Sequence, residues 1–269
     1  MAAQTLPRPA RSYDFVQAMR RPGPAQLAFR SASLPSDAVV LAIDTAGSVC
    51  SAAVAQGDAV LASERRAMRH GHGETLLPMI DRVMTAAGLA PERLDIVAAA
   101  TGPGGFTGIR VGLAAAHGIT LATGAQLVGV SSFEAVAAAV GNGRSMLVAL
   151  DSRRDDLYVQ LFAPAAGGPL AEPLAVLPGA LADYLEAAGL PMAGPLLIAG
   201  DAAVAGAAAL KGRRGIAVAG DSAPDALGVA AAVLRLLRDG AAAGLARPLY
   251  LRPPDVTMPK SRQVAAHLP

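Results

Sequence analysis

Cysteine, tryptophan and lysine are almost missing from this sequence. Cys50 is the single cysteine among 269 residues, which excludes an intramolecular disulfide and a cluster of thiolate metal ligands. Cys50 lies in a strand-like run and is expected to be a small core residue rather than a reactive thiol. Phe, Trp and Tyr make up 3% of the chain whereas 53% is hydrophobic, so the core is predicted to consist mainly of Ala, Val and Leu.

Charge is also sparse, at 16% of the residues, and the net charge of +2 is unevenly placed. Residues 1–37 carry five arginines and two aspartates, a balance of +3 that leaves −1 for the rest of the chain. That remainder lacks the basic stripe of an independent nucleic-acid-binding protein, so any action on RNA would need a partner. Residues 1–37 are rich in Arg, Pro, Ala and Ser without a sustained period, and we predict a disordered extension.

One stretch without Asp, Glu, Lys or Arg, residues 111–133, is long enough to span a lipid bilayer. Its glycines, threonines and histidine argue against a membrane span. It divides instead into the end of a helix, a stop at Gly124 and a strand over residues 127–130. The N-terminus shows no continuous apolar signal segment, so a cytoplasmic protein is expected.

The most distinctive segment is a glycine-rich turn, residues 101–110. An apolar strand over residues 96–100 leads into it, and a helix of small residues over 108–123 follows. The free amides of such a turn can hold an anion at the helix N-terminus. Alternatively, the missing side chains let another backbone segment come close. The turn alone favours the anion cradle, whereas its wider sequence context favours the close approach of another backbone segment.

The order of elements predicts an α/β fold. Strands over residues 39–44, 50–55 and 59–66 are joined by short turns, as in an antiparallel meander. Alternating helices and strands follow as far as residue 141, and a weaker version of the pattern fills the rest. This order is typical of an actin-like (ribonuclease H-like, ASKHA) fold. It predicts two lobes, each a mixed sheet flanked by helices, over residues 38–141 and 142–269, the second lobe being degenerate.

In actin-like lobes the first turn cradles phosphate and an aspartate lies near the metal ion. Here Asp44 ends the first strand, but Ala46 stands where the Asp-x-Gly-x-Thr pattern has glycine. We therefore predict at most a degenerate phosphate site, made of Asp44, Thr45, Gly104, Gly105, Thr107 and Arg110. Thr107 is expected to cap a helix rather than to act as a catalytic hydroxyl. Arg110 fits either an anion ligand or an ordinary exposed helix residue.

His70, His72 and Glu74 are the only cluster that suggests a metal ion. Gly71 and Gly73 would scaffold a metal poorly, and no His-Glu-x-x-His motif is present. An exposed, flexible entry to the helix over residues 74–87 is the expected interpretation. A metallopeptidase has no other support.

Six segments resemble the TsaB (YeaZ) family. They are residues 41–45, 70–80, 102–110, 128–132, 149–153 and 248–252, and they follow in family order. The resemblance implies a role beside TsaD, the enzyme that transfers threonylcarbamoyl to adenosine 37 of ANN-decoding tRNAs. It also implies TsaE as a further partner, tRNA contact only through the complex, and ATP and Mg²⁺ as cofactors of the whole complex rather than of this chain.

The resemblance also argues against catalysis by the chain itself. TsaD carries a metal-binding His-x-x-x-His motif, and Ser132 and Val136 occupy the corresponding positions here. Neither a neutral serine nor a valine replaces an imidazole ligand. No catalytic and no metal-binding residue is therefore predicted, and the inherited glycoprotease label is disfavoured.

The predicted function is a scaffold that binds TsaD through the helices over residues 74–87 and 108–123. The interface is predicted to contain Leu76, Leu77, Ile80, Val83, Met84, Ala114, Ala115 and Gly118. The same faces predict a homodimer when the partner is absent. The alternative is an active actin-like ATPase or small-molecule kinase, which Asp44 and the glycine turn favour.

Overall fold

A computed structural model of the chain describes residues 37–141, 143–164, 168–191, 193–240 and 244–252. All but the last residue of the predicted extension 1–37 lies outside this part. So do residues 253–269.

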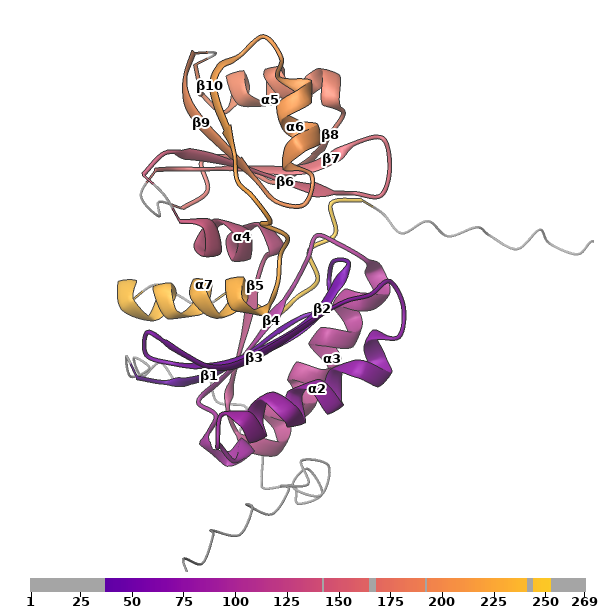
Figure 1. Cartoon of the computed structure of the whole chain (residues 1–269), viewed down its shortest axis with the longest axis vertical. Coiled ribbons are helices and arrows are strands. Elements are labelled where there is room, and N and C mark those ends of the chain that lie inside the picture. Colours follow the sequence, from indigo (N-terminus) through magenta and orange to yellow (C-terminus); the bar gives the residue numbers. More distant parts are fainter. Residues whose placement is uncertain (1–36, 142, 165–167, 192, 241–243, 253–269) are drawn as a thin grey trace, which may run out of the picture.

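The first sheet has the strand order β3-β2-β1-β4-β5 (Figure 1). β1 (Val39–Asp44), β4 (Ile96–Ala100) and β5 (Gln126–Val130) are parallel, and both β1 and β4 are buried along their whole length. β2 (Val49–Gln56) and β3 (Ala59–Ala67) complete the sheet as an antiparallel meander. Continuous Val, Ile and Ala runs suit central strands that are covered on both faces.

The second sheet repeats this topology with the order β10-β9-β6-β7-β8. β6 (Ser145–Asp151) is antiparallel to β7 (Leu157–Phe162) and parallel to β9 (Ala193–Ala199), as β1 is to β2 and β4. β8 (Leu174–Val176) and β10 (Arg214–Val218) form the edges. β8 has three residues against nine in the equivalent β3, which agrees with the degenerate second lobe that the sequence predicts.

Helices cover the outer face of each sheet (Figure 1). α2 (His72–Ala86) packs on β2 and β3, and α3 (Phe106–Thr123) packs on β1, β4 and β5. In the second lobe α5 (Leu181–Ala187) and α6 (Ala203–Ala209) share a core with the second sheet. Two short 3₁₀ turns, Pro91–Arg93 and Pro178–Ala180, precede β4 and α5. The predicted two-lobed α/β fold is confirmed.

Two helices in the middle of the molecule cross between the lobes. α4 (Ser132–Val140) comes from the first half of the chain but packs on β6, whereas α7 (Ala226–Asp239) comes from the second half and packs on β1 and β2. α4 and α7 also pack against each other. The predicted division at residues 141 and 142 therefore separates the two sheets in sequence, but α7 belongs to the core of the first sheet.

Several helix ends differ from the expectation. α2 begins at His72, two residues before the predicted start at Glu74. The residue that precedes it, Gly71, adopts a left-handed conformation with φ of 84°. The cap of α3 is Gly105, so the predicted N-cap role of Thr107 is wrong. Thr107 is an exposed residue inside the first turn. Glu134 lies in the first turn of α4 and forms a capping box with Ser131.

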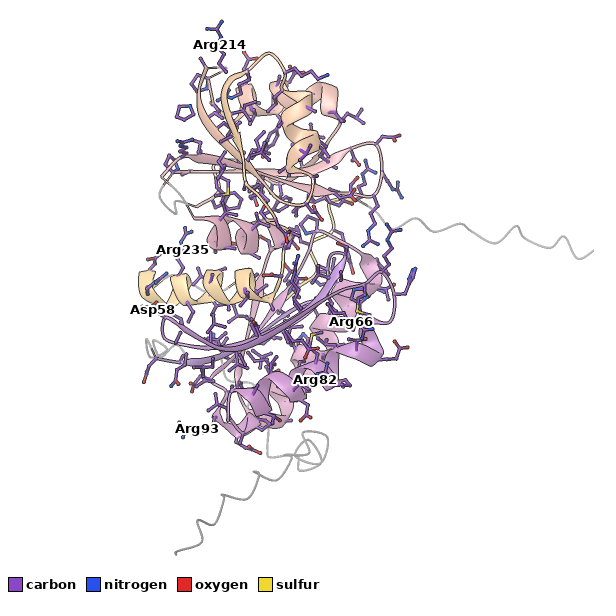
Figure 2. All side chains as sticks on the ribbon, in the orientation of Figure 1. Asp58, Arg66, Arg82, Arg93, Arg214 and Arg235 are labelled. Atoms are coloured by element: carbon purple, nitrogen blue, oxygen red, sulfur yellow. The ribbon has the colours of Figure 1, made fainter. Side chains whose placement is uncertain are left out.

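None of the helices in the described ranges combines the length and the apolar character needed to cross a bilayer. Residues 111–133 divide into α3, a left-handed turn at Gly124, β5 and the start of α4, as predicted. The arginines labelled in Figure 2 lie on separate elements: Arg82 on α2, Arg214 at the far end of the second lobe and Arg235 on α7.

Candidate functional site

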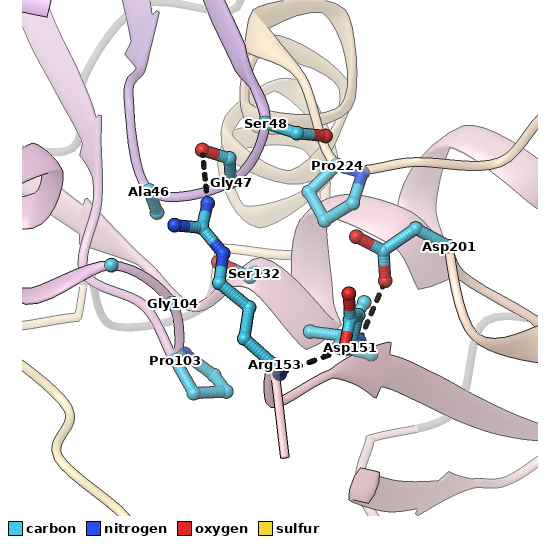
Figure 3. A pocket seen from close by; sticks show the side chains of 12 residues that line it. Ala46, Gly47, Ser48, Pro103, Gly104, Ser132, Asp151, Arg153, Asp201 and Pro224 are labelled. Carbon is cyan, nitrogen blue, oxygen red and sulfur yellow. Dashed lines mark hydrogen bonds between the residues drawn. The ribbon is translucent and has the colours of Figure 1, made fainter. Parts of the chain in front are cut away.

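A cleft lies between the lobes, at the carboxyl ends of the central strands of both sheets (Figure 3). This is the place where open α/β sheets bind ligands. Residues 46–48 after β1 and 103–105 after β4 form the first-lobe side, with Pro224 from the segment before α7 nearby. Leu150, Asp151, Arg153 and Asp201 form the second-lobe side, and Ser132 at the start of α4 lies between the two.

The two lobes contribute matching aspartate turns. Asp44 ends β1 and its Oδ1 accepts a hydrogen bond from the amide of Ala46 at 2.7 Å. Asp151 ends β6 and its Oδ1 accepts the equivalent bond from the amide of Arg153, also at 2.7 Å. Asp201, which follows β9, accepts a 2.8 Å hydrogen bond from the amide of Asp151. The repeated topology thus brings three carboxylates to the cleft region.

Asp44 is buried and unusually basic. Burial raises its pKa to about 7, against the hydrogen bond from Ala46, and Asp225 and Asp201 raise it further. Its Oδ2 has no hydrogen-bond partner within the described part of the chain. The pKa of Asp201 is also raised, mainly by burial.

Arg153 crosses the cleft. Its Nη2 donates a 3.3 Å hydrogen bond to the carbonyl oxygen of Gly47, so the second lobe reaches the first turn of the first lobe (Figure 3). The backbone of Arg153 has φ of 59°, in the left-handed region that residues other than glycine rarely adopt. The guanidinium lies between the two turns and carries a positive charge into the cleft.

The glycine turn packs directly against the turn after β1. A Cβ on Gly104 would lie 2.2 Å from the carbonyl oxygen of Ala46, and one on Gly108 would lie 2.0 Å from that of Thr45. The amide of Gly105 donates to the carbonyl of Ala46 at 2.7 Å. The close-packing use of the turn is therefore confirmed, and one amide that could have cradled an anion is already occupied.

The predicted phosphate residues do not gather in one place. Gly104 and Gly105 line the cleft, and Asp44 and Thr45 are buried beside it. Thr107 and Arg110 are exposed on α3 and are not among the lining residues.

Five lining residues with polar side chains were missed as site residues from the sequence: Ser48, Ser132, Asp151, Arg153 and Asp201. Ser132 has a buried hydroxyl without a partner among the described residues. The repeat of Asp44-Thr45 as Asp151-Ser152, each at the end of a central strand, was the available signal for Asp151 and Arg153.

The expectation for the histidines is wrong in part. His70 and Glu74 are exposed, but His72 is buried at the start of α2 and its Nε2 has no partner in the described ranges. Burial, Arg153 and His70 all lower the pKa of His72, so the ring is neutral at pH 7. Within those ranges, no group of three or more His, Cys, Asp or Glu side chains is arranged to hold a metal ion.

Half of the predicted interface residues are core residues. The buried members are Leu76, Ile80, Val83 and Met84. The apolar face of α2 that the sequence reveals is the face that packs on the first sheet, so these four side chains cannot contact a partner while the fold is intact. Leu77, Ala114 and Gly118 are exposed and Ala115 is half-buried, and their contact with a partner stays a prediction.

Known proteins share both the sequence and the fold. A family model described as "TsaD: tRNA N6-adenosine threonylcarbamoyltransferase" matches residues 64–166. The "tRNA threonylcarbamoyladenosine biosynthesis protein TsaB" of Escherichia coli K12 is 34% identical over 122 residues, which cover 44% of this chain and 52% of that protein. The Bacillus subtilis 168 protein of the same name is 30% identical over 151 residues, covering 55% of this chain and 64% of that protein. The resemblance to TsaB is confirmed.

The matched segment spans about half the length of the Escherichia coli and Haemophilus influenzae TsaB proteins, at 52% and 51%. A solved structure named "YeaZ from Pseudomonas aeruginosa" superposes on this chain with a TM-score of 0.66 and 24% sequence identity. The match covers 80% of this chain and 100% of that protein. At that identity the likeness establishes the fold alone.

The match to the TsaD model includes α4, which carries Ser132 and Val136, the two residues compared with a His-x-x-x-His motif in the sequence. Ser132 lines the cleft, and Val136 is buried in an apolar cluster with Phe133 and Leu150. A hydroxyl and an isopropyl group offer no imidazole nitrogen at these two positions.

Proposed function

We propose that the chain is a non-catalytic subunit in the synthesis of N6-threonylcarbamoyladenosine (t6A). In this role it binds TsaD and activates the transfer of threonylcarbamoyl to adenosine 37 of ANN-decoding tRNAs. The observation that carries the proposal is the cleft, which keeps the two-lobed frame but holds Ser132 in place of a metal ligand and Arg153 across its opening. A fold that keeps its frame without its reactive groups suits a scaffold.

The proposed docking surface is the outer face of α2 and α3. The two helices pack beside each other on the first sheet, and their outer face points away from that sheet (Figure 1). Leu77 and Leu121 are large exposed apolar residues, and Ala114 and Gly118 are small exposed ones. Small side chains let a second helix pair approach closely, while the leucines supply apolar area. In the absence of TsaD the same face would support a homodimer.

The remaining components follow from this role. TsaE joins the complex of TsaD and this chain, ATP and Mg²⁺ serve the complex, and tRNA is held through the complex in the cytoplasm. The near-neutral charge of residues 38–269 supports this arrangement, since an isolated tRNA-binding protein would need more phosphate contacts.

The test is reconstitution of tRNA modification with purified TsaD and TsaE, ATP and threonylcarbamoyl precursors, with t6A measured by nucleoside analysis. We expect modification and co-purification with TsaD only when this chain is present. The double variant Leu77→Asp and Leu121→Asp should lose both while keeping its thermal unfolding midpoint. Val204→Asp, at an exposed position on α6 in the other lobe, is the matched control. Full modification without the chain would contradict the proposal.

A second candidate is an actin-like ATPase, which the paired turns of Asp44 and Asp151 favour. Calorimetric titration of the isolated chain with Mg-ATP separates the two functions. The scaffold predicts no micromolar binding, because Arg153 and the amide of Gly105 already have partners in the cleft. Micromolar binding would favour the ATPase.

A further inference from the structure

An arginine on α3 contacts two aromatic side chains, one from its own helix and one from a segment far along the chain. The guanidinium carbon of Arg110 lies 3.7 Å from the centre of the Phe106 ring. Its Nε donates a 3.2 Å hydrogen bond to the hydroxyl of Tyr250. The rings of Phe106 and Tyr250 lie 5.2 Å apart at a tilt of 30°. We call these three residues the Arg110 cluster.

The Arg110 cluster orients the guanidinium but leaves its two terminal nitrogens available as hydrogen-bond donors. Stacking on Phe106 and the bond from Nε restrict the plane and the direction of the group. Nη1 and Nη2 have no hydrogen-bond partner or ion pair within the described ranges. A guanidinium with both terminal nitrogens free is a two-pronged donor that matches a carboxylate or a phosphate. Because the side chain is already ordered, binding an anion costs less conformational entropy.

The surroundings favour a protein carboxylate over a nucleic-acid phosphate. Phe106 is 39% exposed and Tyr250 is 40% exposed, so both rings are available to a partner. The exposed face of α3 continues from Arg110 through Ala114 to Gly118, with small residues and no acid. An exposed Tyr, Phe and Arg together have the composition of a protein-binding hot spot. A strand of nucleic acid would need several cations in a row.

We propose that the Arg110 cluster receives an acidic side chain of the protein partner that docks on α2 and α3. This inference rests on the proposed function and adds a charged contact to its apolar face. Arg110 makes the contact, and Tyr250 is a positioning residue that holds Nε so that the two terminal nitrogens point outward. The tail segment that carries Tyr250 thereby takes part in partner recognition, although it lies 140 residues away in sequence.

The test measures the affinity of the full chain for TsaD by calorimetry at two salt concentrations. Arg110→Ala should weaken binding about tenfold or more, the usual size of a charge-assisted pair, and should flatten the salt dependence. Arg110→Glu should be weaker still, because two carboxylates would face each other. Tyr250→Phe should weaken binding about threefold alone and have no further effect beside Arg110→Ala. Arg214→Ala, on the distant edge of the second lobe (Figure 2), is the control and should bind like the wild type.

The outcomes separate this inference from the proposed function. If the wild type binds TsaD and Arg110→Ala binds equally well, the carboxylate contact is overturned and the scaffold role stands. It is likewise overturned if Arg110→Glu is no weaker than Arg110→Ala. If TsaD affinity is unchanged but the complex retains less tRNA, the ligand is a phosphate and the proposal is wrong. If the wild type does not bind TsaD, both the carboxylate contact and the proposed scaffold function are wrong.

Discussion

At the scale of the residue, Asp44 makes stability depend on pH. Its pKa of about 7 in the folded chain lies above the ordinary value of 3.8, so the folded chain binds more protons than the unfolded chain between these values. The contribution of this carboxyl to the free energy of unfolding is therefore full below pH 3.8. It is lost as the pH rises through 7.

The variant Asp44→Asn should remove that loss. A shift of one pKa unit corresponds to about 1.4 kcal/mol, and part of the gain is offset because an amide donor would replace the unpartnered Oδ2. We expect the variant to be about 2 kcal/mol more stable than the wild type at pH 8 and, because the cost of the amide donor remains, about 2 kcal/mol less stable at pH 4, measured by urea unfolding. A stability difference between variant and wild type that does not change with pH would contradict a raised pKa.

The two glycines at 108 and 118 lie in one helix but serve different purposes. A Cβ on Gly108 would meet the backbone oxygen of Thr45 at 2.0 Å, whereas nothing lies within 4 Å of one on Gly118. Gly108→Ala should lower the free energy of unfolding by about 3 kcal/mol, because the backbone must move. Gly118→Ala should raise it by about 0.5–1 kcal/mol through better helix propensity. Equal effects in chemical denaturation would show that the close packing at Thr45 is absent.

At the scale of the element, the tail segment joins the two lobes. The amide of Leu249 donates to the carbonyl of Thr101 after β4 at 2.8 Å. Arg252 pairs with Asp156, which is buried at the start of β7 and also accepts a hydrogen bond from Ser152. An extended run of nine residues, 244–252, thus connects the glycine turn to the β6–β7 turn.

Loss of the Arg252 pair should destabilise the chain. The side chain of Arg252 is 31% exposed and that of Asp156 is 2% exposed, so Arg252→Ala leaves a buried carboxylate that keeps the hydrogen bond from Ser152 but has lost its cation. We expect a loss of about 2 kcal/mol in thermal or urea unfolding. Arg238→Ala is the matched control, since its pair with Asp58 is 59% and 81% exposed and should be worth less than about 0.5 kcal/mol. Similar losses in both variants would show that the tail contact does not stabilise the fold.

The sequence predicted elements better than it predicted contacts. Buried strands such as β1 and β4, and the glycine turn between β4 and α3, are recognisable because local composition determines them. The apolar face of α2 was recognised too, but periodicity shows only that a face is covered and not what covers it. Leu76 and Ile80 were therefore assigned to a partner although they pack on the first sheet.

The cleft shows the same limit. Arg153 meets Gly47 across 106 residues of sequence, and Asp201 meets Asp151 across 50. The sequence around each of these residues carries no signal for its distant partner. In the sequence, Arg153, Asp151 and Asp201 therefore resemble ordinary turn residues. Only the repeat of strand order in the two lobes places Asp44 and Asp151 in equivalent positions, and that repeat is weak in sequence because the second lobe is shortened.

At the scale of the whole molecule, the crossed helices make the two lobes depend on each other. Buried residues of α7, including Val229, Ala230 and Val233, belong to the core of the first sheet. α4 in turn contributes Phe133 and Val136 to a cluster with the second sheet and with Leu249 of the tail. Each lobe therefore lacks part of its core when the chain is divided between the sheets.

A chain that ends at residue 141, the predicted domain boundary, should for this reason not fold alone. It would expose the face of the first sheet that α7 covers. Loss of about three buried aliphatic side chains, at about 1.5–3 kcal/mol each for the larger ones, is comparable to the whole stability of a small domain. We expect no cooperative thermal transition in circular dichroism and poor dispersion in amide NMR spectra. A chain of residues 37–252, which keeps α7 and the tail, should unfold in one cooperative transition. A sharp transition in the shorter chain would instead make residues 38–141 an independent domain, with α7 an accessory to its core.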